Sequence, residues 1–106
     1  MYKTVTFALV IVTGLSAGAL AANQMITQKG RVFSAENVTI KKGDALTFVN
    51  DDSIPHNIMS GTKGSEFNLG SQAPGMSTDV TFKEAGDVQV ICAIHPRMKM
   101  MVKVTD

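Results

Sequence analysis

The chain has 106 residues, of which 44% are hydrophobic and 18% are charged, so it has polypeptide for one domain with one core. Ten lysines and arginines against nine acidic residues leave a formal charge of +1. Because no basic or acidic run stands out, a nucleic-acid partner is not supported. One cysteine excludes an intramolecular disulfide, and two histidines exclude most metalloenzymes that use many histidines. A complex enzyme is therefore a poor interpretation of this composition.

The start of the chain has the pattern of an export signal. Lys3 supplies one positive charge, residues 5–20 carry none, and the run ends in the Ala-Leu-Ala that suits a signal peptidase. The alternative is a retained membrane anchor, but the run is barely long enough to span a bilayer, and its second half is rich in glycine and alanine. We therefore expect a cleaved signal peptide over residues 1–21 and a mature exported domain over residues 22–106, with no membrane span after cleavage.

The remainder of the chain alternates apolar and polar residues, and it shows no helical spacing over three turns. Apolar residues two positions apart predict strands, in chain order, at 38–40, 46–48, 80–82, 88–92 and 102–104. Turn-forming residues cluster at 42–44, 50–53, 60–65, 73–75 and 84–87. Seven or eight short strands separated by such turns predict an all-β fold, and specifically a β-sandwich.

The residues with metal-binding chemistry lie in two short segments, 50–58 and 92–100. Cys92 continues the phase of the preceding apolar residues of its strand, so its sulfur should point into the sandwich at one end. His95 follows the end of that strand and can turn back toward the sulfur, while His56 begins another predicted strand. Two imidazoles, a thiolate and a thioether are the ligands of a trigonal copper site with a weak axial bond.

The thioether has more than one candidate. Met98 is our prediction for the axial ligand, with Met100 as the alternative, because both could reach back toward Cys92. Met100 also suits packing inside the sandwich, since Val102 and Val104 set the core phase. A lone cysteine is usually a small buried hydrophobe, but an exported thiol three residues from a histidine is hard to explain by packing alone.

These segments resemble a known family. Pro55-His56-Asn57 together with Cys92-x-x-His95 resembles the cupredoxins, the small blue (type 1) copper proteins. The short loop that continues through Pro96-x-Met98 looks most like that of amicyanin, within the plastocyanin and pseudoazurin group. The similarity also takes in Gly70, Pro74-Gly75 and Phe82 through Val104, so it covers nearly the whole mature chain.

The resemblance implies a cupredoxin-like Greek-key β-sandwich of seven to eight strands with one type 1 copper ion at one end. His56, Cys92 and His95 would be the equatorial ligands and Met98 the axial ligand. Asn57 matches the family position that joins the two ligand segments by hydrogen bonds near the sulfur. One ring edge of His95 would form the route by which electrons enter and leave.

The function that follows is a soluble periplasmic carrier of single electrons, monomeric and not an enzyme. Its partners would be redox proteins, a donor and an acceptor such as a dehydrogenase and a cytochrome c, that dock near His95. Arg97 and Lys99 beside His95 depart from the amicyanin pattern, and a basic rim favours an acidic partner surface.

Three other functions are weighed against this one. A periplasmic protein for copper storage or delivery is the main alternative, since the chain has seven methionines, although they form no Met-x-x-Met ladder. A copper oxidase or nitrite reductase would need further histidines for a second copper centre, and both histidines are already used. A sandwich that binds no metal is the last possibility.

Overall fold

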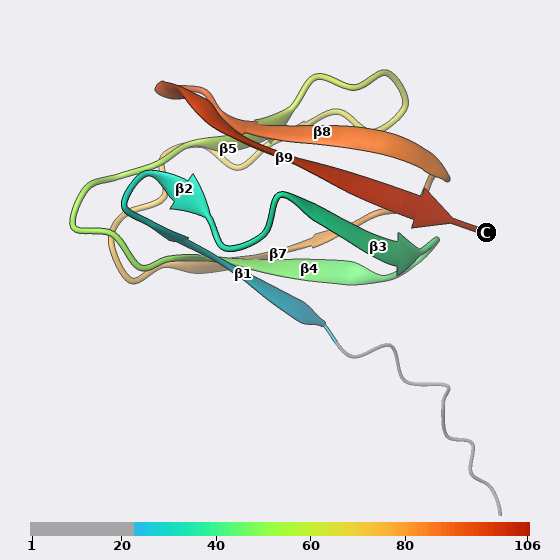
Figure 1. Ribbon diagram of the computed structural model, residues 1–106, viewed down its shortest axis with the longest axis horizontal. Helices are drawn as coiled ribbons and strands as arrows, with labels where there is room; N and C mark the ends of the chain where they lie inside the picture. Colours follow the sequence, from blue (N-terminus) through green and yellow to red (C-terminus); the bar gives the residue numbers. More distant parts are fainter. Residues whose placement is uncertain (1–22) are drawn as a thin grey trace, which may run out of the picture.

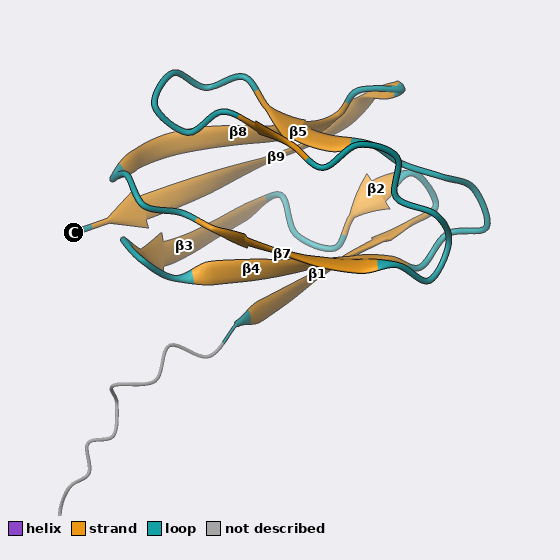
Figure 2. Ribbon diagram, turned by 180° about the vertical axis from the view of Figure 1, so that it is seen from behind, coloured by secondary structure: helices purple, strands orange, loops and turns teal. Residues whose placement is uncertain are grey.

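The computed structural model describes residues 23–106 and shows two β-sheets packed face to face (Figure 1, and Figure 2 from behind). The predicted signal peptide, residues 1–21, lies outside the described residues. Within the part of the chain that the structure describes, no helix has the length and apolarity needed to cross a membrane.

The two sheets have four and five strands. The order in the first is β2-β1-β4-β7, with bounds β1 Gln24–Lys29, β2 Val32–Phe33, β4 Ala45–Asn50 and β7 Ser77–Thr81. The order in the second is β3-β9-β8-β5-β6, with bounds β3 Asn37–Lys41, β5 Ile58–Ser60, β6 Phe67–Asn68, β8 Gly86–Cys92 and β9 His95–Thr105. The chain crosses between the sheets after β2, β3, β4, β6 and β7, as expected of a Greek-key sandwich.

The core lies between the sheets because most inward positions of the long strands are apolar. Leu46 and Phe48 of β4 face Val88 and Val90 of β8 across a continuous buried cluster, and all four are at most 1% exposed. Alternate residues of β9 join the same cluster, namely Met98, Met100, Val102 and Val104. The apolar residues that recur every two positions in the sequence therefore form the inner faces of the two sheets. The predicted all-β fold is confirmed.

The strand count differs slightly from the prediction. The described residues form nine strands, whereas seven or eight were expected. Two of the nine, β2 and β6, are only two residues long. A two-residue pairing has no alternation for a sequence pattern to detect, so these strands follow from tertiary contacts.

Three connections meet at one end of the sandwich, on the left in Figure 1. The loop after β4 is joined to the β1–β2 turn, because the backbone N–H groups of Gly30 and Arg31 donate to the carboxylate of Asp52. The β8–β9 turn is joined to the segment before β5, because Ala93 N–H donates to the carbonyl oxygen of Asn57 at 2.8 Å. The fold thus brings the two segments with metal-binding residues to the same end.

Candidate metal centre

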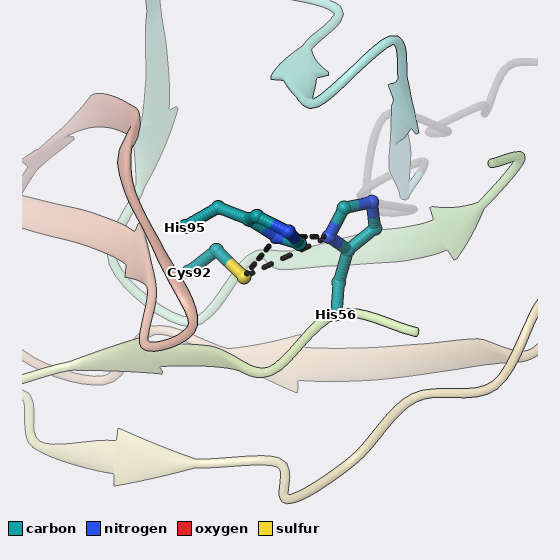
Figure 3. Close-up of side chains that lie close together, drawn as sticks. All are labelled: His56, Cys92 and His95. Atoms are coloured by element: carbon teal, nitrogen blue, oxygen red, sulfur yellow. Dashed lines mark hydrogen bonds between the residues drawn. The ribbon is translucent and has the colours of Figure 1, made fainter. Parts of the chain in front are cut away.

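Three donor atoms converge at this end of the sandwich (Figure 3). His56 Nδ1 lies 3.1 Å from His95 Nδ1, and Cys92 Sγ lies 3.7 Å from His56 Nδ1 and 3.6 Å from His95 Nδ1. His56 and Cys92 are fully buried, while His95 is partly exposed. The cluster therefore has a dry interior side and one residue that reaches the surface.

Cys92 and His95 are placed by the junction of β8 and β9. Gln89, Val90 and Ile91 pair in regular register with β9, but the register shifts at Cys92, which pairs with His95. This irregularity lets a two-residue turn, Ala93 and Ile94, return the chain so that His95 faces the sulfur. Spacing of the Cys-x-x-His type is therefore what a tight β8–β9 connection needs to place both donors together.

His56 is held by its backbone before its side chain makes any contact. Its N–H donates to the carbonyl oxygen of Gln72 at 3.1 Å, and Gln72 N–H donates back at 2.7 Å. Gln72 is itself 1% exposed, and its side chain donates to the carbonyl oxygen of Phe48 and accepts from Gln28. A buried polar network thus ties His56 to the four-stranded sheet.

The structure places Asn57 beside the sulfur through its backbone. Asn57 N–H donates to Cys92 Sγ at 3.3 Å, and its carbonyl oxygen accepts from Ala93 N–H. The side chain instead donates to Asn68 Oδ1 on β6 at 2.8 Å. The two ligand segments are therefore joined by main-chain bonds, and the amide side chain secures the neighbouring strand.

Both candidate methionines point into the sandwich. Met98 is 1% exposed and Met100 is 3% exposed, and they lie two residues apart on the inward face of β9. Met100 pairs with Val90, whereas His95 pairs with Cys92. Met98 is consequently the inward methionine nearer the donor cluster.

Asp52 is a residue of this site that the sequence analysis treated only as part of a turn. Its Oδ2 lies 2.8 Å from His56 Nε2. Burial opposes ionisation of this carboxyl, but hydrogen bonds from Arg31 N–H, His56 and Gly30 N–H lower the pKa of Asp52 to about 2. The sequence did offer one signal for this role, because Asp52 is an acidic residue four positions before the candidate ligand His56 in the same loop.

The donor set fits a copper ion. Nitrogen and sulfur donors that share one first-row metal ion at about 2.0–2.3 Å lie roughly 3–4 Å from one another. The three separations here, 3.1 to 3.7 Å, fall in that range. A soft thiolate with two imidazoles is also the equatorial set that suits both oxidation states of copper.

Comparison with known proteins points the same way. Residues 21–105 match the family described as copper binding proteins, plastocyanin/azurin family. The chain is 30% identical over 87 residues to plastocyanin of Solanum crispum, covering 72% of this chain and 88% of that protein. It is 39% identical over 61 residues to the methylamine utilization protein MauL of Methylorubrum extorquens, covering 57% of this chain and 54% of that protein.

Two solved structures show the same fold. A purple cupredoxin from Nitrosopumilus maritimus superposes with a TM-score of 0.69 at 28% identity, covering 78% of this chain and all of that one. Amicyanin from Paracoccus versutus also gives 0.69 at 28% identity, covering 80% of this chain and 83% of that one. The chain therefore belongs to the plastocyanin/azurin family of copper binding proteins, the cupredoxins, and copper is its cofactor.

Proposed function

We propose that His56, Cys92 and His95 hold the copper ion in its equatorial plane and that Met98 is the axial ligand. The observation that carries this proposal is the cluster of three donor atoms at 3.1 to 3.7 Å. The burial of Met98 on the inward face of β9, nearer Cys92 than Met100 lies, supports its choice as the fourth ligand.

The protein would act as a carrier of single electrons, because copper in such a set of ligands changes between Cu(II) and Cu(I) with little rearrangement. The chain supplies the rigidity: Cys92 and His56 are fully buried, Cys92 Sγ accepts from Asn57 N–H, and the backbone of His56 exchanges hydrogen bonds with that of Gln72. Their burial excludes water from the inner side of the site. His95 is the partly exposed member, so its ring edge is the proposed electron route.

The surface around His95 suits transient docking. An open groove of about 510 Å³ runs beside it, and its apolar lining includes Val32 and Ile94, which are 59% and 53% exposed. Arg31 and Arg97 border the same groove. Apolar contact gives a close approach, while the positive rim increases the association rate with a partner whose docking face is acidic.

The proposed partners are a donor and an acceptor protein, such as a dehydrogenase and a cytochrome c. Likeness to amicyanin and to a methylamine utilization protein supports a bacterial setting of this kind. We further propose that residues 1–21 direct export to the periplasm, where residues 22–106 act as a soluble monomer. Both histidines of the chain belong to the cluster, which leaves none for a second, catalytic copper centre, so we propose no enzyme activity.

Redox cycling of the copper-loaded protein tests this function against copper storage or delivery. A carrier should be reduced by ascorbate and reoxidised by ferricyanide through several cycles, and it should retain its copper through gel filtration after each. Its copper should also stay bound when an apo-protein that accepts copper is added. Loss of copper on reduction, or ready transfer to the acceptor, would support copper handling instead.

A further inference from the structure

A carboxylate lies on the opposite side of the His56 ring from the donor cluster. Asp52 Oδ2 is 2.8 Å from His56 Nε2, whereas His56 Nδ1 faces Cys92 and His95. A neutral imidazole carries one ring proton, and an ionised carboxylate can only accept hydrogen bonds. The proton therefore belongs on Nε2, which leaves the lone pair of Nδ1 directed at the point where Cys92 and His95 converge.

Asp52 is itself fixed from several directions. Its Oδ1 accepts from Gly30 N–H at 2.7 Å, and its Oδ2 accepts from Arg31 N–H at 3.0 Å. Its own N–H donates to Asn50 Oδ1 at 2.9 Å. The side chain of Asp52 is only 13% exposed, and that of His56 is fully buried. The carboxylate thus has little freedom to move away from the ring.

The far end of this chain of contacts is anchored in the four-stranded sheet. Asn50 is the last residue of β4 and is fully buried, and its side-chain amide donates to the carbonyl oxygens of Ile54 and Gln72, both at 2.9 Å. Gln72 is also the backbone partner of His56. The main chain and the ring of His56 are therefore held by one connected set of buried polar groups.

We propose that Asp52 is a positioning residue, which keeps the ring proton of His56 on Nε2 and so presents Nδ1 as the copper donor. This inference rests on the proposed role of His56 as a copper ligand. A carboxylate on the remote nitrogen fixes the ring orientation and makes the imidazole a stronger donor. A stronger donor favours Cu(II) over Cu(I), so Asp52 would lower the reduction potential of the site.

The alternative is that Asp52 merely closes the β1–β2 turn through Gly30 and Arg31. The variant Asp52→Asn tests the His56 contact, because its amide oxygen can keep the bond from Gly30 N–H while its amide nitrogen, which can only donate, then faces His56 Nε2. Asp51→Asn is the matched control. Asp51 is exposed, and its variant removes the same charge one residue away without touching His56.

Two measurements are needed, and the first requires no copper. Correlation spectra of metal-free protein labelled with nitrogen-15 in histidine report which ring nitrogen of His56 carries the proton. We expect Nε2 in the wild type and in Asp51→Asn, and a mixture or the Nδ1 form in Asp52→Asn. A proton on Nδ1 in the wild type overturns the inference, whether or not Asp52→Asn folds.

The second measurement is chelator competition for each oxidation state. Asp52→Asn should bind Cu(II) about 10- to 100-fold more weakly, and Cu(I) with a smaller loss. Each tenfold excess of the loss in Cu(II) affinity over the loss in Cu(I) affinity raises the one-electron reduction potential by about 59 mV. Equal reduction potentials in Asp52→Asn and Asp51→Asn would contradict the proposal and show that Asp52 serves only to close the β1–β2 turn. Failure of the proposed function would look different from failure of this inference. In the first case the wild type would lack the spectrum of a type 1 copper site, and the tautomer of His56 in the metal-free protein would still decide the role of Asp52.

Discussion

At the scale of single residues, the donor cluster depends on side chains whose backbones are fixed by other groups. Asn57 N–H and the bulge at the end of β8 fix Cys92, and the bridge with Gln72 fixes His56. Such fixing matters for electron transfer, because a site that does not rearrange loses little energy when the metal changes charge. The identity of the fourth ligand is the residue-scale question that mutation can answer.

Replacing Met98 with leucine should change the copper site without unfolding the protein. The swap nearly conserves volume in a buried position, so its cost in stability should stay below about 1.5 kcal/mol. Loss of the thioether should alter the electron paramagnetic resonance spectrum and the reduction potential. Met100→Leu is the matched control from the same face of β9 and should leave both unchanged. A shift in Met100→Leu alone would make Met100 the axial ligand.

The carboxyl of Asp52 gives the metal-free protein a stability that depends on pH. Its pKa falls from 3.8 to about 2 on folding, so the unfolded chain binds the proton more tightly. The resulting stabilisation, at most about 2.5 kcal/mol, is fully present above about pH 5 and is lost as the pH falls through 2. Urea unfolding should show that lowering the pH from 6 to 3 reduces the free energy of unfolding less for Asp52→Asn than for Asp51→Asn. Equal losses would contradict this account.

At the scale of elements, the β1–β2 turn is the unusual one. Arg31 has a φ of 60°, a left-handed conformation that costs a residue with a Cβ about 1–2 kcal/mol. The N–H bonds of Gly30 and Arg31 to Asp52 hold the turn in this shape. The strained arginine borders the groove beside His95, where its positive charge serves the proposed docking.

Glycine at position 31 should therefore stabilise the fold. Arg31→Gly removes the strain, and we expect the free energy of unfolding to rise by up to about 1 kcal/mol. Arg97→Gly removes the same side chain from the extended strand β9, where glycine should cost about 0.5–1 kcal/mol. Chemical unfolding of the two variants measures both effects. Destabilisation by Arg31→Gly would show that the side chain contributes more than its backbone strain costs.

The elements also show where sequence reasoning succeeds and where it stops. Strands β4, β8 and β9 were predictable because their inward positions are apolar, apart from Asn50 at the end of β4. Strand β1 was not, because its inward positions include the buried Gln28 while Met25 is 63% exposed, which breaks the alternation. Gln28 faces inward because Gln72 accepts its hydrogen bond, and a partner 44 residues away leaves no local signal.

The donor cluster divides in the same way. His56, Cys92 and His95 could be named because few residue types bind copper and the chain has only one cysteine and two histidines. Asp52 could not, because aspartate is ordinary in a turn. Its role depends on how the loop after β4 folds against the β1–β2 turn, which the local pattern does not specify.

At the scale of the whole molecule, copper binding and the stability of the fold are coupled. A copper ion that binds only the folded chain adds stability by mass action, about 4 kcal/mol at a free concentration one thousand times the dissociation constant. For a domain of this size that should raise the melting temperature by more than 10 °C. Calorimetry with and without copper measures the shift, and Cys92→Ser should abolish most of it. An equal shift in Cys92→Ser would place the binding elsewhere.

The most direct test of the central claim is the visible and electron paramagnetic resonance spectrum of the protein with one equivalent of Cu(II). The account predicts an intense thiolate-to-copper band that ascorbate bleaches and ferricyanide restores, and that Cys92→Ser lacks. A weak spectrum like that of copper bound to an ordinary peptide, or the same band in Cys92→Ser, would contradict a copper site built on Cys92.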